Sequence, residues 1–269
     1  MEIGVMFWAG RDNLRELRAL GVQSGQLGVG GDTPLTSAAA VEWREAIADA
    51  GFSIATVVCA YSGEEYADIP TVQRTVGFIP PATREAREQR TLDACDFAAA
   101  LGVKSIACHV GFVPADHADP DYIAVRGMVR RICDRAEKHG QTFALETGQE
   151  PADTLLDFLD DAACPNLKVN FDPANMVLYG SGDPIEAFER LAPHVVSIHA
   201  KDGDWPEKRG SLGKERPLGQ GSVGIPRFVD ALKRSGYQGS INIEREIEDQ
   251  TQRLTDIGMA VRLLKGLGV

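Results

Sequence analysis

The amino-acid sequence predicts an α/β fold, a (β/α)8 TIM barrel that forms a single domain over residues 1–269. Eight short runs of β-branched and apolar residues alternate with stretches of helical periodicity, which is typical of repeated βα units and a parallel sheet. A length of 269 residues suits one such barrel. A doubly wound sheet ordinarily has fewer strands and a G-x-G-x-x-G turn after the first one, where this chain has WAGRDN.

Each expected strand is followed by an expected helix. The eight strand runs are EIGVMF (2–7), SGQLGV (24–29), SIATVVCAY (53–61), KSIACHV (104–110), TFALET (142–147), LKVNFD (167–172), VVSIHA (195–200) and SINIER (240–245). The clearest helix covers residues 84–102 and ends at Gly102, because glycine readily adopts the left-handed conformation that closes a helix. The same signal recurs at Gly21, Gly51, Gly140 and Gly236.

Three connections that follow strand ends are long. They cover residues 62–82, 111–118 and 201–222. In a TIM barrel the loops after the C-terminal ends of the strands carry the active site, so we expect these loops to surround it.

The charge of the chain argues against nucleic acid as a partner. Lysine and arginine total 28 against 39 acidic residues, and a net charge of −11 repels a phosphate backbone.

The opening MEIGVMFWAG is not a signal peptide, and no run approaches the ~20 apolar residues of a membrane span, so we expect a cytoplasmic protein without membrane contact. The five cysteines show no C-x-x-C spacing, which predicts reduced thiols. A homo-oligomer is compatible with the sequence.

Polar residues at the ends of four consecutive strands share one phase. Side chains alternate between the two faces of a strand, so every second residue of a barrel strand points into the lumen. In VVSIH we expect Val196 and Ile198 to face outward and Ser197 to face inward, and the neighbouring strands alternate in the same way. The inward side chains at the four strand ends are Glu146, Asp172, His199 and Glu244.

Three converging carboxylates require a cation, because burying an unpaired charge is costly. Three carboxylates with one imidazole suit a hard or borderline divalent ion, Mn²⁺ first, with Mg²⁺ or Co²⁺ possible. A single acidic residue or histidine at a strand end is more often structural, but four in phase favour a metal site. Among the other histidines, inward-facing His109 is open to substrate contact or a structural role, His139 and His194 are expected to be structural, and His117 indicates little.

Several stretches in the second half resemble a known family. They are ALETGQE, VNFDPANMVLYGSGDPIEAFERL, VVSIHAKDGD, PLGQGSVGIPRFVDAL and GYQGSINIERE. The chain is similar there to the xylose-isomerase-like TIM barrels of the sugar phosphate isomerase/epimerase family, specifically over about residues 140–246, whereas the first half matches mainly in its βα rhythm.

The resemblance implies a metal held by residues after strands five to eight. The matching positions are Glu146, Asp172, His199 and Glu244. Many members have a histidine three residues after the strand-six aspartate, where this chain has Asn175. Asparagine can hydrogen-bond a substrate hydroxyl but cannot act as an acid or base near neutral pH.

The expected metal site and the family resemblance together predict a metal-dependent sugar isomerase or epimerase that transfers a proton through an enediolate. Glu146 and Glu244 would be its acid/base pair. A metal-dependent dehydratase of the inosose dehydratase type is the alternative, because the same groups can expel a β-hydroxyl. Apurinic endonucleases share this barrel but carry a basic face and more histidines. A further alternative is a non-catalytic barrel with a vestigial metal site. The presence of both Glu146 and Glu244 argues against it, because such a barrel would not need them.

Substrate contacts are expected from His109, Asn175, Lys201 and Trp8. Lys201 could bind a substrate oxygen with Asp202 to orient it, while Trp8 and Phe112 could pack on a sugar, although simple rim packing is favoured.

Three further features lie near the expected site. Glu246 could be a partner behind the metal ligands, and Arg245 is expected to pair with an acidic residue outside the barrel. The run GQGSVG (219–224) could offer amide groups to a phosphate, a weak indication because glycine runs are usually turns.

Overall fold

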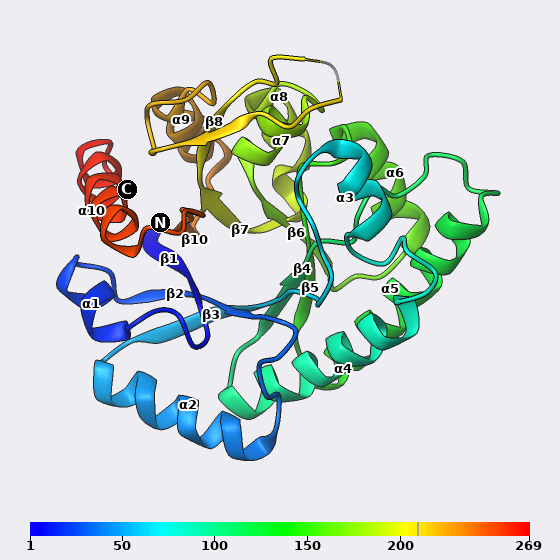
Figure 1. Cartoon of the computed structure of the whole chain (residues 1–269), viewed down its shortest axis with the longest axis horizontal. Helices are drawn as coiled ribbons and strands as arrows, with labels where there is room; N and C mark the ends of the chain where they lie inside the picture. Colours follow the sequence, from blue (N-terminus) through cyan, green and yellow to red (C-terminus); the bar gives the residue numbers. More distant parts are fainter. Residues whose placement is uncertain (209) are drawn as a thin grey trace.

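The structure, a computed structural model, describes residues 1–208 and 210–269 and shows a closed barrel of eight parallel strands inside a ring of helices (Figure 1). Neighbouring strands around the barrel follow one another along the chain, and the last strand pairs with the first. The predicted fold class is therefore confirmed. The barrel strands are β1 (Glu2–Trp8), β2 (Ser24–Val29), β3 (Ser53–Cys59), β4 (Ser105–Cys108), β5 (Thr142–Glu146), β6 (Leu167–Phe171), β7 (Val195–Ala200) and β10 (Ser240–Ile243).

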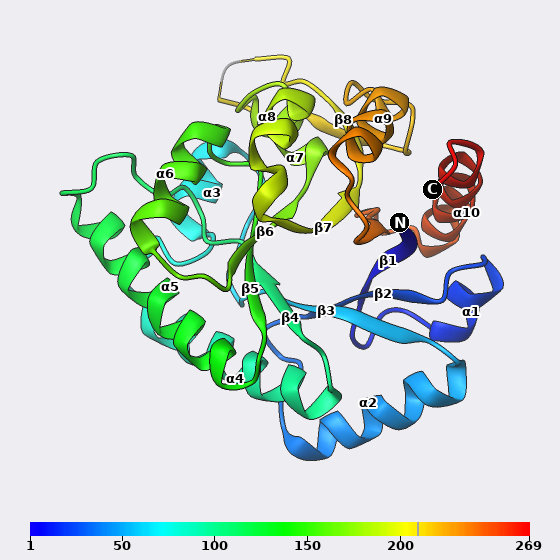
Figure 2. The same ribbon diagram turned by 180° about the vertical axis from the view of Figure 1, so that it is seen from behind.

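The helices surround the barrel on all sides, as the views from both ends show (Figures 1 and 2). They are α1 (Leu14–Ala19), α2 (Ser37–Ala50), α3 (Ile69–Thr75), α4 (Arg84–Leu101), α5 (Pro120–Lys138), α6 (Ala152–Ala162), α7 (Pro173–Tyr179), α8 (Pro184–Leu191), the 3-10 helix η1 (Ala192–His194), α9 (Ile225–Ser235) and α10 (Gln250–Gly266). The predicted glycine stops are correct: Gly102 closes α4 with φ +80°, a left-handed conformation that glycine adopts without strain.

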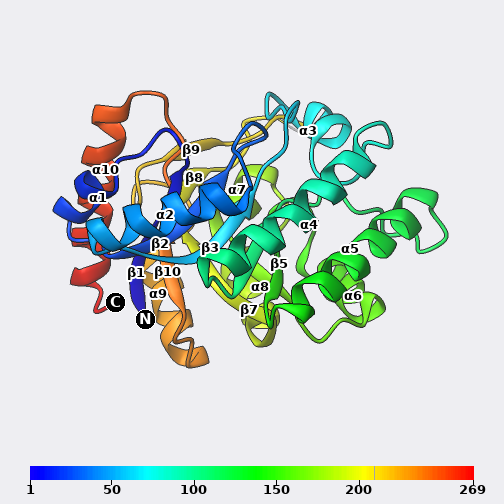
Figure 3. The ribbon, with the colours of Figure 1, turned by 90° about the horizontal axis from the view of Figure 1, so that it is seen from below.

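Two of the long connections contain structure that periodicity did not predict. Helix α3 lies within residues 62–82, and the antiparallel strands β8 (Asp202–Asp204) and β9 (Lys214–Arg216) lie within residues 201–222. All three elements are too short to show a hydrophobic period. They lie at the end of the barrel opposite the two chain termini (Figure 3).

The hydrophobic core has two parts. The larger part fills the space between strands and helices, where Phe171 packs against Phe188 and Phe228 with ring centroids 5.6 and 5.9 Å away. The smaller part fills the barrel lumen and consists of Met6, Val58, Ala107 and Ala144. This second part is the floor beneath the strand ends.

The expectation that Val196 faces outward is wrong. Val196 packs against the lumen cluster, because β7 carries one extra residue where Val169 pairs with Val195 and Asn170 pairs with Ser197. Such a bulge shifts the alternation of side chains locally. Ser197 nevertheless points inward as expected, since the bulge precedes it.

Within residues 1–208 and 210–269, no helix combines the length and the apolar composition that crossing a lipid bilayer demands.

Candidate metal centre

Four buried side chains converge at the C-terminal ends of β5, β6, β7 and β10. They are Glu146, Asp172, His199 and Glu244, and their candidate ligand atoms all lie within 4.8 Å of one another. The imidazole Nδ1 of His199 lies 3.3 Å from Glu146 Oε1, 3.5 Å from Asp172 Oδ2 and 3.1 Å from Glu244 Oε2. The structure thus brings together the four residues that the strand phase and the family resemblance indicated.

The donor atoms of this cluster fit a divalent cation. His199 Nδ1 and Asp172 Oδ2 are buried without a hydrogen-bond partner among the described residues, which is costly unless another group meets them. Burial opposes protonation of His199, but Glu244 and Glu146 outweigh it and raise its pKa well above its ordinary value. The cluster therefore attracts positive charge. Three carboxylates and one imidazole nitrogen are a suitable donor set for Mn²⁺, Mg²⁺ or Co²⁺.

His199 is oriented by side chains inside the lumen. Its Nε2 lies 2.6 Å from Gln26 Oε1 on β2 and 3.0 Å from Asn170 Nδ2 on β6. Gln26 in turn donates to Asn170 Oδ1 at 3.1 Å, and Ser197 donates to the same oxygen. A proton on Nε2 that points to Gln26 leaves the Nδ1 lone pair free for a metal ion, the usual arrangement of a metal-binding histidine.

Asp172 has separate roles for its two carboxylate oxygens. As the N-cap of α7, it accepts the backbone amides of Ala174 and Asn175 on Oδ1 at 2.8 and 3.0 Å. These bonds stabilise the start of the helix and hold the carboxylate rigidly. Oδ2 then points to the cluster, where it faces His199.

Glu146 receives hydrogen bonds from the side facing the pocket. His109 Nε2 lies 3.2 Å from Glu146 Oε1, and Asn175 Nδ2 donates to the same oxygen at 3.2 Å. Gln149 Nε2 lies 3.0 Å from His109 Nδ1 and fixes the ring. Burial alone would lower the pKa of His109, but Glu146 outweighs it and raises that pKa to about 9. In return, His109 and His199 outweigh the opposing effect of burial and hold the pKa of Glu146 well below its ordinary value.

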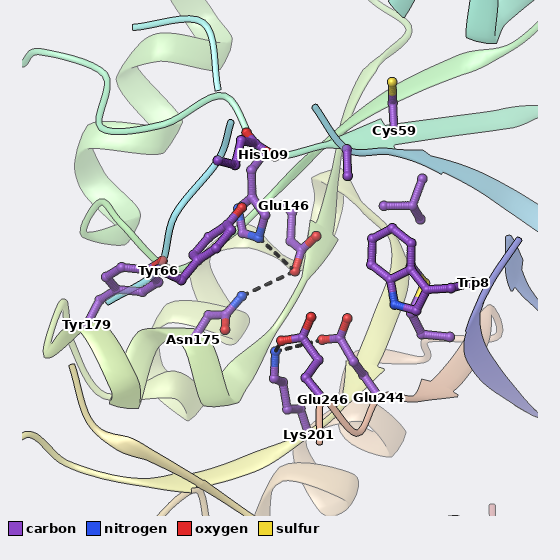
Figure 4. Close-up of a pocket in the computed structure, with 14 residues that line it drawn as sticks. Trp8, Cys59, Tyr66, His109, Glu146, Asn175, Tyr179, Lys201, Glu244 and Glu246 are labelled. Carbon is purple, nitrogen blue, oxygen red and sulfur yellow. Dashed lines mark hydrogen bonds and ion pairs between the residues drawn. The ribbon is translucent and has the colours of Figure 1, made fainter. Parts of the chain in front are cut away.

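Lys201 is buried next to the cluster, with only 4% of its side chain exposed. Its Nζ lies 2.9 Å from Glu244 Oε2, an ion pair without hydrogen-bond geometry, and donates to Glu246 Oε2 at 2.8 Å. Figure 4 shows Lys201, Glu244 and Glu246 grouped on one side of the pocket. Glu246 thus contacts the lysine rather than a metal-ligand atom directly.

A pocket with a cavity volume of about 150 Å³ opens over the metal cluster (Figure 4). All four predicted substrate-binding residues line it: Trp8, His109, Asn175 and Lys201. Trp8 lies close over Gly28, where a Cβ atom would come within 2.6 Å of the indole ring. Phe112 does not line the pocket but packs edge-on against Tyr179, which does, with ring centroids 5.8 Å apart.

Sequence reasoning missed several residues of the site. Tyr66 and Glu64 come from the connection after β3, Tyr179 ends α7, and all three line the pocket. Loop residues such as Tyr66 follow no period that could identify them. Gln26 could have been found, because a polar residue in a buried barrel strand needs a partner.

The expectation that Asp202 orients Lys201 is wrong. The Asp202 carboxylate instead accepts the backbone amides of Gly203 (2.9 Å), Gly219 (2.9 Å), Gly221 (3.0 Å) and Val223 (3.1 Å). In the run 219–224, three of the amides suggested for a phosphate are thus already bonded to a carboxylate. Backbone donors satisfied inside the protein are no longer available to an anion.

Three other polar residues, Arg245, His139 and His117, lie away from the pocket. Arg245 pairs with Asp256 at 2.7 Å and with Glu215 at 2.7 Å, as expected for a side chain outside the barrel. His139 and His117 are bonded to Asp96 and Asp157 at 2.8 and 2.6 Å, away from the metal cluster.

Comparison with known proteins identifies the family of this barrel. A family model described as xylose isomerase-like TIM barrel matches residues 14–267. The chain belongs to this xylose isomerase-like family. A crystal structure of a xylose isomerase domain protein from Planctomyces limnophilus is 40% identical, with a TM-score of 0.95 over 98% of this chain and 96% of that chain.

Solved structures with lower sequence identity share the fold alone. D-psicose 3-epimerase from Clostridium cellulolyticum H10, solved with D-tagatose, is 17% identical with a TM-score of 0.73 over 99% of both chains. A barrel protein from Mycobacterium smegmatis, solved in complex with magnesium, is 18% identical with a TM-score of 0.70 over 94% of this chain and 86% of that chain.

The curated relatives are matched only in part. Uncharacterized protein YihM of Escherichia coli (strain K12) is 26% identical over 141 residues, which is 51% of this chain. The alignments with it and with a second relative, from Methanocaldococcus jannaschii, span 43% and 55% of those proteins, so the chain spans about half the length of the curated relatives it matches.

Proposed function

We propose that this protein is a divalent-metal-dependent sugar isomerase or epimerase, with Mn²⁺ as the first candidate metal and Mg²⁺ or Co²⁺ as alternatives. The observation that carries the proposal is that Glu146 and Glu244 both line the pocket and both belong to the metal cluster. Figure 4 shows them approaching the pocket from different sides. Two carboxylates so placed can serve opposite faces of one planar intermediate.

The residues of the pocket supply the proton transfer. Removing a proton from the carbon beside a carbonyl leaves an enediolate, and returning it requires a conjugate acid within reach. One glutamate accepts the proton and the other returns one. Return to the same carbon from the opposite face inverts that carbon, whereas return to the neighbouring carbon converts an aldose and a ketose into each other.

A divalent cation held by Glu146, Asp172, His199 and Glu244 would supply Lewis-acid polarisation of the substrate carbonyl. The protein's own donors prepare the base: His109 and Asn175 both contact Glu146 Oε1, and donors to a carboxylate favour its ionised form, which is the state a general base needs. Both N–H groups of the Asn175 amide are donated to Glu146 Oε1 and to the carbonyl oxygen of Thr147, so its amide oxygen is the atom that can accept a hydrogen bond from a substrate hydroxyl. Lys201 lines the same pocket with its ammonium group. Trp8, at the pocket edge, can cover the apolar face of a sugar ring.

The test is an activity screen of the metal-loaded protein on ketoses, aldoses and inososes, with and without a chelator. We expect conversion of at least one sugar, loss of conversion on chelation, and recovery with Mn²⁺. Glu244→Gln and Glu146→Gln should each abolish turnover without unfolding the barrel. Glu248→Gln, which removes an exposed carboxylate beyond the pocket, is the matched control and should stay active.

Three results would contradict the proposal. They are turnover that is indifferent to the chelator, a fully active Glu244→Gln variant, and no conversion of any sugar by a metal-loaded protein. Product analysis decides between the proposed reaction and the dehydratase alternative, because a dehydratase releases water and changes the product mass.

A further inference from the structure

The pair Lys201 and Glu246 forms one wall of the pocket. The ammonium of Lys201 lies 2.8 Å from Glu246 Oε2, 2.9 Å from Glu244 Oε2 and 3.7 Å from Asp172 Oδ2. A single positive charge is thus shared by three carboxylates. It is already neutralised, so it cannot serve as the binding group for an anionic substrate.

The charge of the whole pocket is negative. Its walls and the metal cluster hold five carboxylates, namely Glu64, Glu146, Asp172, Glu244 and Glu246. Among residues 1–208 and 210–269, Lys201 is the one lysine or arginine that lines the pocket. Lys201 and a divalent cation together would still leave two negative charges in excess. In a partly desolvated pocket this excess repels a phosphate dianion.

The backbone offers no compensating phosphate site next to the cluster in the described part of the chain. In the run 219–223, the amides of Gly219, Gly221 and Val223 are bonded to Asp202 and the other two donate to backbone carbonyl oxygens. The amides that open α7 are bonded to Asp172. Each of these potential anion sites is thus filled by an internal carboxylate, although helix starts of this kind are where phosphates commonly bind.

Glu246 is positioned to form a hydrogen bond with a substrate in the pocket. Its side chain is 49% exposed, and its backbone N–H donates to Glu215 Oε1 at 3.0 Å, which fixes the main chain. Lys201 donates to Oε2 and thereby holds the carboxylate at the pocket wall. Among the described residues no group is bonded to its other carboxylate oxygen, which can accept a hydrogen bond from a hydroxyl.

We propose that Glu246, positioned by Lys201, is the specificity-determining residue of the site and restricts it to uncharged polyhydroxy aldehydes and ketones, excluding their phosphate esters. This inference rests on the proposed function for the position of the substrate over the metal cluster. Glu246 accepts a hydrogen bond from a substrate hydroxyl, which that hydroxyl can no longer donate once it is esterified with phosphate, and the carboxylate repels the charge of the ester.

Calorimetric titration of the metal-loaded protein with matched pairs tests the inference. Suitable pairs are D-fructose with D-fructose 6-phosphate and D-xylulose with D-xylulose 5-phosphate. We expect the free sugar of the better-binding pair to bind at least about tenfold more tightly than its ester, because a charge-assisted hydrogen bond is lost and like charges meet. In Glu246→Gln this preference should fall several-fold, whereas Glu248→Gln should keep it.

Equal or tighter binding of the phosphate ester, an unchanged preference in Glu246→Gln, or binding of neither member of any pair would overturn the inference. The titration does not depend on turnover, so the two proposals can fail separately. Preferred binding of free sugars without conversion would contradict the reaction and support the substrate class. Metal-dependent conversion of a phosphate ester in preference to its free sugar would support the reaction and contradict the substrate class.

Discussion

The imidazole Nε2 of His199 lies 2.6 Å from the amide oxygen of Gln26, across the barrel lumen and 173 residues away along the chain. Removing the amide should loosen the imidazole and lower metal affinity. For Gln26→Met we expect a loss of about 10–100-fold in Mn²⁺ affinity, measured by calorimetry. Gln141→Met is the control: it removes another buried amide, bonded to Cys95 O and Val103 O, and should leave Mn²⁺ affinity unchanged. Wild-type affinity in Gln26→Met would show that this contact does not orient a metal ligand.

Metal binding should stabilise the fold, because the converging carboxylates repel one another without it. At a metal concentration of 100 times the dissociation constant, the free energy of unfolding should rise by about 2.7 kcal/mol. In Asp172→Asn, which keeps an oxygen for the N-cap of α7 but loses the charge, most of this increase should disappear. Asp249→Asn changes the N-cap of α10 in the same way and should retain it. Thermal melts with and without Mn²⁺ measure both, and an equal shift in the two variants would argue against Asp172 as a ligand.

Arg253 on α10 contacts both the segment at the end of β1 and the segment that follows β10, and both segments border the pocket. It is 1% exposed, pairs with Asp12, and donates to the carbonyl oxygens of Arg245 and Met6 at 2.9 Å each. Asp12 in turn accepts the amide of Trp8 at 2.8 Å. Arg253→Met removes the cation that pairs with the buried carboxylate of Asp12, so we expect a loss of about 3–5 kcal/mol in the free energy of unfolding.

Urea denaturation measures the effect of Arg253→Met. The control is Arg234→Met, which removes an exposed ion pair with Glu189 and should cost less than about 1 kcal/mol. If the two substitutions cost the same, the buried pair is not a major source of stability.

Glu150 should make stability depend on pH. Burial raises the pKa of its carboxyl to about 7, although the amide of Val113 donates to it at 2.8 Å. Because the folded protein holds this proton more tightly than the unfolded chain, stability contributed by the neutral carboxyl is present at low pH. It is lost as the pH rises through about 7.

Glu150→Gln removes that titration. Its melting temperature should match the wild type near pH 4.5 and exceed it by a few degrees at pH 8. The exposed carboxylate of Glu45 provides the control, since Glu45→Gln should show no such difference between the two pH values. A wild-type pH profile for Glu150→Gln would contradict the assignment of the raised pKa.

The barrel and its metal cluster could be predicted from the sequence because they depend on local periods. Alternation along β5, β6, β7 and β10 decides which side chains face the lumen, and parallel strands present their C-terminal ends at one rim. The proximity of Glu146 and Glu244 could therefore be predicted, although nearly a hundred residues separate them along the chain. The bulge at Val196 shows the limit of this reasoning, since one extra residue reverses the phase locally.

The sequence by itself determined the strand order, the closing glycines and the set of acidic and imidazole groups at the barrel rim. Each of these depends on a pattern formed by residues that are close together in the sequence. Only the tertiary structure decided that Gln26 meets His199, that Lys201 is buried among carboxylates, and that Asp202 fills the amides of a glycine-rich turn. The physical reason is that hydrogen bonds and ion pairs form between whatever side chains the packed backbone brings within about 3 Å, and no periodicity records that distance.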